Sequence, residues 1–201
     1  MLFRSSVFDL SYSKLFTGDM GYLYPVMHDE VMPGDKFKIA NQMVIRMMPL
    51  VSPVLHEIDA YVHYFFVPYR LLDENWEEFI TGGVDGGDTS SLPTWNPTGA
   101  NGVGTLWDYM GMPVGIVPTG TLPLDYPKLA YNLIWNEYYM DPTLQTEVDI
   151  TTSQVLLLRN WEKDYFTSCL PWQQRGTAPA LPIAGTTSAV WQASTFPNPL
   201  S

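Results

Sequence analysis

The residues of this sequence that could do chemistry are few, and each lacks a partner that its chemistry requires. His56 and Glu57 begin the pattern of a zinc protease, but Ala60 stands where that pattern needs its second histidine. His63 lies further along a strand-like segment, and its odd offset from His56 places the two rings on opposite faces. The pattern therefore favours ordinary sheet or interface histidines over ligands of a metal ion.

The other candidate groups also favour structural roles. Cys169 has no evident general base to activate it, so we predict a small buried thiol rather than a nucleophile. The run from Gly82 to Asp88 lacks the Gly-Lys-Ser/Thr ending of a phosphate loop, and its aspartates miss the spacing of the known calcium loop. Glu74, Glu77 and Glu78 fit the solvated side of a short helix. We expect no catalytic residue, no metal site and no cofactor, and therefore no enzyme.

Composition sets limits on the partners of the chain. The net charge is −11, from 10 basic and 21 acidic residues, which argues against a clamp for nucleic acid because phosphate contacts need clustered cations. The single cysteine excludes an internal disulfide and favours assembly inside a reducing cell. Residues 1–10 do not resemble a signal peptide, and no stretch approaches the roughly 20 apolar residues of a membrane span. We expect no membrane insertion.

The same composition predicts a loop-rich β-protein that exposes little charge. Apolar residues make up 46% of the 201 residues, charged residues only 15% and aromatic residues 14%, with 17 prolines and 15 glycines. Surfaces that meet other protein are depleted in lysine and glutamate and enriched in tyrosine, tryptophan and methionine. Extensive subunit contact is one interpretation, and an ordinary secreted β-protein is the other.

Residues 30–70 are predicted to form the core strands. The runs Lys36–Met47 and Ile58–Val67 are rich in β-branched, aromatic and long apolar residues, and each is bounded by proline or glycine. In the first run apolar residues occupy the odd positions, which is typical of a half-buried strand. Pro33, Gly34 and Asp35 predict a type II turn that leads into this strand.

Three cations share the even-numbered face of the first run: Lys36, Lys38 and Arg46. They would form a small basic stripe that could make a weak contact with DNA, and the alternative is a solvated strand face. The second run becomes continuously apolar around Phe65 and Phe66, which predicts that both of its faces are covered.

The remaining residues are predicted to flank this centre. Residues 1–29 form an arm and an edge strand, which either docks on a neighbouring subunit or closes its own sheet edge. Residues 71–150 form a helix and loop insertion. It contains a short helix that begins at Asp73, presents Trp76 and stops at Gly82 and Gly83, and a clear helix over residues 125–140 that carries Trp135. Residues 151–201 supply further strands and loops.

Several motifs resemble the amino-terminal part of the major capsid protein of the Microviridae, and especially of its gokushovirus branch. They are PGDKF, IRMMPLVSPV, YFFVPYRLL and ENWEEF, with further blocks at FDLSYSKLFTGDMGYLYPV, LAYNLIWNEYYMD and DYFTSCLPWQQRG, in the order expected of the family. The resemblance implies a mainly β fold, a viral jelly-roll β-sandwich with long loop insertions and short helices. A jelly roll needs eight strands, whereas we count roughly four, so we expect the fold to be incomplete in this chain.

The resemblance also implies a function. It predicts a structural virion protein of a bacteriophage, a major capsid subunit that self-assembles with identical copies into a small T=1 icosahedral shell around single-stranded DNA. Other virion proteins and a host receptor are expected partners, with assembly in the cytoplasm of the host bacterium. The residues predicted to support the fold or the assembly are Pro33, Gly34, Asp35, Phe65, Phe66, Trp76 and Trp135. The alternative is a β-sandwich module for carbohydrate or receptor recognition, in which exposed aromatic residues stack on sugars; Trp95 and Trp107, in the long loop region, are its candidates.

Overall fold

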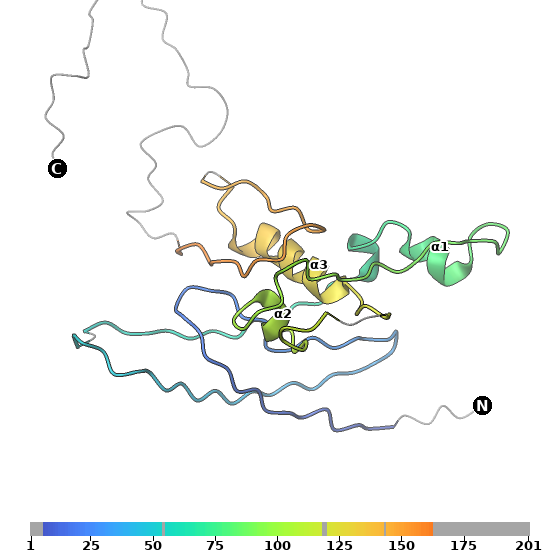
Figure 1. Cartoon of the computed structure of the whole chain (residues 1–201). Helices are drawn as coiled ribbons and strands as arrows, with labels where there is room; N and C mark the ends of the chain where they lie inside the picture. The colour runs from blue at the N-terminus through green and yellow to red at the C-terminus, as the bar shows by residue number, and fades with distance from the viewer. Residues whose placement is uncertain (1–5, 54, 118–119, 143, 163–201) are drawn as a thin grey trace, which may run out of the picture. The chain divides into compact units, whose positions relative to one another are not determined.

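Short helices are the regular structure of the part of the chain that is described, which comprises residues 6–53, 55–117, 120–142 and 144–162 of a computed structural model. They are η1 (Tyr69–Leu71), α1 (Trp76–Thr81), α2 (Leu106–Tyr109), α3 (Tyr126–Ile134) and η2 (Trp135–Tyr139) (Figure 1). All of them belong to the unit Met1–Trp161; of the second unit, Glu162–Ser201, only its first residue is described. The predictions for residues 163–201, including Cys169, lie outside the described residues.

The predicted helix over residues 125–140 is confirmed as α3 followed by the π-helical turn η2. Asp125 holds the N-cap position and Pro127 lies in the first turn, where its missing N–H is not needed. The Asp125 carboxylate does not cap the helix. It pairs instead with Lys128, at 3.0 Å from Oδ2 to Nζ. Burial raises the pKa of Asp125, and the neighbouring ammonium group opposes that rise.

A row of polar side chains on α3 and η2 fixes the segment that follows them. Lys128, Asn132 and Asn136 recur at intervals of four residues and so share one face of the helix. Lys128 Nζ donates to the carbonyl of Thr151 at 2.5 Å, and the Asn132 amide donates to the carbonyls of residues 150 and 153, each at 3.0 Å. Asn136 both donates to and accepts from the backbone of Val148. Residues 148–153 have no regular structure, so these side chains satisfy their backbone groups.

The predicted short helix begins later than the sequence indicates. Its N-cap is Asn75 rather than Asp73, because the Asp73 carboxylate accepts the Asn75 N–H at 3.0 Å and its own carbonyl accepts from Trp76. Asp73 therefore organises the turn before α1 instead of capping it. The predicted stop is confirmed: Gly82 takes a φ of +81° and donates its N–H to the carbonyl of Glu78 at 2.8 Å.

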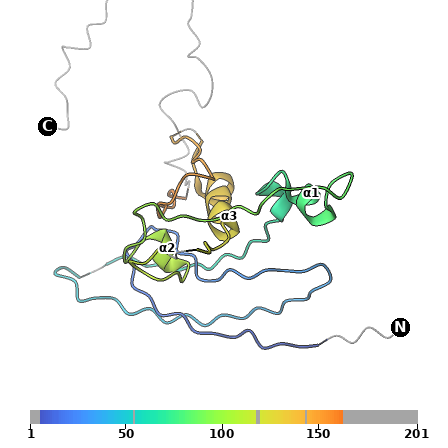
Figure 2. The same cartoon turned by 45° about the vertical axis from the view of Figure 1, so that its right-hand side comes forward.

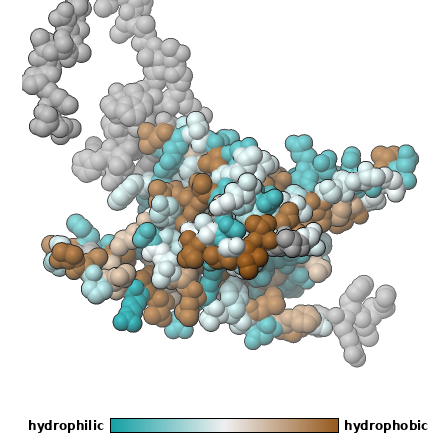
Figure 3. All heavy atoms as spheres, viewed as in Figure 1, coloured by the Kyte–Doolittle hydropathy of each residue, from teal (hydrophilic) through white to brown (hydrophobic). Residues whose placement is uncertain are grey.

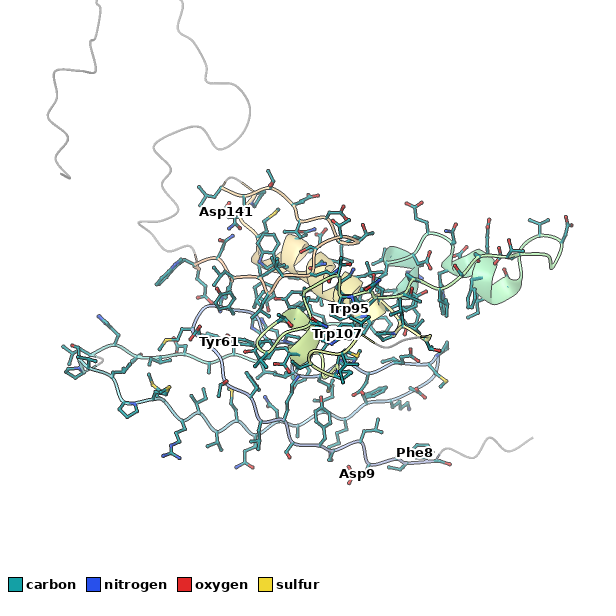
Figure 4. The ribbon with its side chains drawn as sticks, viewed as in Figure 1. Phe8, Asp9, Tyr61, Trp95, Trp107 and Asp141 are labelled. Atoms are coloured by element: carbon teal, nitrogen blue, oxygen red, sulfur yellow. The ribbon has the colours of Figure 1, made fainter. Side chains whose placement is uncertain are left out.

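The hydrophobic core lies between α2 and α3, which are side by side in both views (Figures 1 and 2). Its buried members are Trp95, Leu106, Trp107, Met110, Tyr131, Trp135 and Leu157. Trp95 and Trp107 meet edge to face with their ring centroids 5.0 Å apart (Figure 4). Trp107 Nε1 donates to the carbonyl of Pro113 at 2.9 Å, and Trp135 Nε1 donates to that of Leu158 at 2.7 Å. The rings of Trp107 and Trp135 are therefore buried with their indole N–H groups bound to backbone carbonyls, whereas Trp95 Nε1 is buried without a hydrogen-bond partner among the described residues.

The predicted core strands do not contribute to this core. Among the described residues, pairing of the strand type is limited to two isolated bridges, between Tyr22 and Leu158 and between Thr94 and Leu124. The runs Lys36–Met47 and Ile58–Val67 form no ladder, and every described residue from 27 to 61 is exposed. A strand is stable only when a neighbour satisfies its backbone groups, and here neither run has such a neighbour. The jelly roll therefore stays a prediction.

Truncation of Trp107 tests the assignment of the core. We expect Trp107→Ala in the full-length protein to lower the free energy of unfolding by about 3–5 kcal/mol, because a fully buried ring leaves a cavity. Urea denaturation followed by circular dichroism measures the change. The control is Val103→Ala, an exposed residue of the same loop region, which should change stability by less than about 0.5 kcal/mol. Equal midpoints for the two variants would contradict the assignment.

Candidate interaction surface

Apolar side chains reach the surface along the extended segment that precedes the helices. In Figure 3 hydrophobic residues gather at the end where the chain turns near residues 50–55, and others follow the extended runs on either side of it. A soluble monomer rarely exposes a contiguous apolar patch of large size. The extended segment is therefore the candidate interaction surface of this chain.

The turn that leads into this segment is confirmed. The Asp35 N–H donates to the carbonyl of Met32 at 3.1 Å across Pro33 and Gly34, and Gly34 has a φ of +95°. Only glycine adopts this conformation at little cost, as position i+2 of a type II turn requires. The Asp35 carboxylate also accepts the Met32 N–H at 3.1 Å, so two hydrogen bonds join the ends of the turn.

A row of rings anchors the end of the segment to the helical part of the unit. Tyr61, His63 and Phe65 alternate with residues of the opposite face, as extended backbone dictates. Tyr61 lies 5.5 Å from the Arg159 guanidinium (Figure 4). His63 Nδ1 is 2.5 Å from the Tyr139 hydroxyl and its ring stacks on that tyrosine. The Phe65 ring lies 4.9 Å from that of Tyr138. Sequence reasoning missed this row, because nothing in residues 61–65 indicates contact with residues near 139.

The arm packs on its own unit. Lys14 donates to the carbonyls of Pro25 and Tyr109, and burial lowers its pKa. The Tyr109 hydroxyl donates to Thr17 at 2.7 Å, and backbone bonds join residues 21 and 23 to residues 157–159. Both predicted roles of the arm stay predictions, because these contacts within the unit include only one isolated bridge, between Tyr22 and Leu158, and close no sheet edge among the described residues. Phe8 and Asp9 nevertheless remain exposed near its beginning (Figure 4).

The predicted assembly residues divide into two classes. Trp135 is 4% exposed and belongs to the core, and Trp76 is half-buried against the rings of Tyr69 and Tyr126. Phe66 is 73% exposed, so among these aromatic candidates it presents the most surface to a partner. Phe65 is less exposed because Tyr138 covers part of its ring.

The basic stripe lies wholly on the surface. Lys36, Lys38 and Arg46 are exposed, and no ion pair within the described ranges involves them. Their contact with DNA stays a prediction.

The alternative in which Trp95 and Trp107 form a stacking platform for sugars is contradicted. Their exposed fractions are 1% and 0%, so neither ring has a face open to a ligand. A position in the long loop region does not imply exposure here, because both rings pack in the core with Met110, Tyr131 and Trp135.

The described residues hold no group of three or more histidine, cysteine, aspartate or glutamate side chains placed to bind a metal ion. None of the helices in the same residue ranges is long and apolar enough to cross a bilayer.

Comparisons with known proteins agree on one family. The model of the family described as capsid protein (F protein) matches residues 2–199. The chain is 37% identical to the capsid protein VP1 of Chlamydia phage 1, over 90% of this chain and 36% of that protein. It is 33% identical to the capsid protein VP1 of Bdellovibrio phage phiMH2K, over 89% of this chain and 35% of that protein. A third relative, the capsid protein VP1 of Spiroplasma virus 4, is 25% identical over 90% of this chain. The chain thus spans about a third of the length of the first two relatives.

Truncation of Tyr139 tests how the interaction surface is anchored. We expect Tyr139→Ala to speed chymotrypsin cleavage at residues 61–66, because it removes both the stacked ring and the hydroxyl that His63 contacts. If the anchored segment loses about 1.4 kcal/mol of stability, the cleavage rate should rise roughly tenfold wherever local opening precedes cleavage. Tyr139→Phe should fall between wild type and alanine, and Trp161→Ala, at an exposed ring, should change nothing. Unchanged cleavage of Tyr139→Ala would refute the anchor.

Proposed function

The chain belongs to the capsid protein (F protein) family of phages, and from this premise we propose that it serves within a major capsid subunit that self-assembles into a small icosahedral shell. The observation that carries the proposal is the family match over residues 2–199, together with relatives that are all named capsid proteins. A structural role in the virion follows, without an enzymatic one. The enclosed genome is single-stranded DNA, and the shell has T=1 symmetry.

The proposed fold of the whole subunit is a viral jelly roll. Two features support it: the alternation of apolar residues along residues 36–47, and the exposure of the described residues from 27 to 61. In the complete subunit other segments would pair with these runs and bury their apolar sides. The helices α1 to α3 and the loops around them would then form an insertion between strands.

The proposed partners are identical subunits, other virion proteins and a host receptor, with assembly in the cytoplasm of the host bacterium. The charge of −11 makes this stretch a poor neutraliser of phosphate. A separate basic protein of the virion is therefore the proposed main counterion for the packaged DNA. The packing energy of the shell would come from apolar and aromatic surface shared between copies.

Two truncations separate assembly from folding. We expect Phe66→Ala to leave the melting temperature of the subunit almost unchanged and to reduce particle yield, because this exposed ring is available to a partner. Trp135→Ala should reduce both the melting temperature and the particle yield, because it leaves a cavity in the core. Particle yield is measured by sucrose-gradient sedimentation and negative-stain microscopy after expression of the full-length protein, and Val103→Ala is the control. Normal yield from both truncations would count against a capsid role for these residues.

A further inference from the structure

Two surfaces of this chain are complementary in both charge and hydrophobicity, and both are free in the described structure. The first is the acidic finger, which we define as residues 73–88 and which contains α1 and the loop after it. The second is the outer face of residues 36–48, which we define by its even positions.

The acidic finger carries charge of a single sign. The sequence holds no lysine or arginine between Arg70 and Lys128. The acidic residues of the finger are Asp73, Glu74, Glu77, Glu78, Asp85 and Asp88. Glu74, Glu77 and Glu78 are exposed, and none forms an ion pair within the described ranges.

The finger also exposes apolar side chains. Trp76 packs on Tyr69 and is thereby half-buried, but Ile80 and Val84 stand free at 63% and 102% exposure. A carboxylate cluster alone would fit a purely solvated helix side. Free apolar residues beside it indicate a surface that is completed by a partner.

The outer face of residues 36–48 has the matching character. Lys36, Lys38 and Arg46 share the even positions with Val44 and Met48, which flank Arg46. Val44 and Met48 are 86% and 83% exposed, whereas the apolar residues at odd positions are about half covered. The even positions therefore face outward and combine cations with free apolar side chains.

We propose that the acidic finger of one subunit docks on the outer face of residues 36–48 of a second copy. Opposite charges align across the contact, and Ile80 and Val84 meet Val44 and Met48. The two surfaces are different parts of one chain, so the contact is heterologous, and such contacts close into rings when the rotation between copies permits. This proposal rests on the proposed shell function and names one contact within it.

The observations favour a second copy over DNA as the partner of the basic stripe. The stripe offers only three cations. Its affinity for single-stranded DNA would therefore fall with only about the second power of the salt concentration. The exposed side chains of Val44 and Met48, on either side of Arg46, suit an apolar partner and gain nothing from phosphate. The chain itself supplies the opposite charge together with apolar residues.

Charge reversal of the two surfaces in turn tests the contact in the full-length protein. The stripe variant is Lys36→Glu, Lys38→Glu and Arg46→Glu, and the finger variant is Glu74→Lys, Glu77→Lys and Glu78→Lys. Each of these two variants by itself places like charges opposite one another in the contact. We therefore expect self-association of either variant at low salt to fall roughly tenfold or more. An equimolar mixture should associate again, because the reversed stripe of one variant meets the reversed finger of the other. The variant that carries both changes should also associate.

The measurements are light scattering and sedimentation at low and high salt, with particle yield as the final readout. The control is Glu57→Lys, Glu137→Lys and Glu147→Lys, which changes net charge as the finger variant does at exposed sites elsewhere. It should associate like wild type. Circular dichroism checks folding. If charge reversal unfolds α1, the glutamine versions of both triple variants serve instead, because they remove the charges without reversing them, and they should show a weaker loss of association.

The outcomes separate this contact from the shell function. Wild-type association of both reversal variants overturns the contact and leaves the capsid function standing. Failure of the mixture and of the combined variant to recover overturns the pairing of these two surfaces. A stripe variant that forms normal particles with less packaged DNA assigns the stripe to the genome instead. Loss of particles in wild type itself would refute the proposed function rather than this contact.

Discussion

The polar row on α3 and η2 is the constraint on which the described structure depends. Lys128 and Asn132 are almost fully buried, and their donors end on backbone carbonyls of the irregular segment 150–153. Each such carbonyl, left without a partner in the interior, would cost about 1–3 kcal/mol. Because the row fixes this segment, it also directs the chain toward Leu157, which belongs to the core, and Leu158, whose carbonyl accepts from Trp135 Nε1. These two residues pair with residues 22 and 23 of the arm. A core made without a sheet thus obtains its order from side chains rather than from strand ladders.

The sequence predicts those features whose cause is local. The turn at Gly34, the end of α1 at Gly82 and the start of α3 near Asp125 each depend on the backbone preference of one or two residues, and all three are confirmed. Trp95 and Trp107 were misjudged, because their burial depends on a loop folding over α2 and α3, which no nearby residue signals. The anchoring of Tyr61, His63 and Phe65 was missed for the same reason. Its partners lie more than seventy positions away in the chain, as the 76-residue separation of His63 and Tyr139 illustrates.

The extended segment poses a different problem, since its local pattern and its observed burial disagree. The odd positions of residues 36–47 are apolar as in a half-buried strand, and they are indeed more covered than the even positions, but no neighbouring strand satisfies their backbone. The alternation of apolar residues indicates which side of a strand is buried, but it does not identify the segment that covers that side. The chain spans about a third of the length of the first two relatives, and the described residues contain no sheet, so the jelly roll of the whole subunit stays a proposal that the alternation supports.

The low charge and the high aromatic content of the chain have separate consequences for association. Trp95, Trp107 and Trp135 lie in the core and Tyr139 anchors one segment to another, so these rings do not themselves make the chain associate. The exposed apolar residues that remain, such as Phe66 and Val44, would drive association without selecting an orientation, because hydrophobic contact is not directional. Cations share the outer face of residues 36–48 with exposed apolar residues such as Val44, and carboxylates lie near the exposed apolar residues of the acidic finger. Their net contribution to affinity is small in water, but like charges placed together exclude wrong arrangements. In a shell built from many identical copies, apolar surface would therefore supply the free energy of assembly, while the sparse charges determine which surfaces meet.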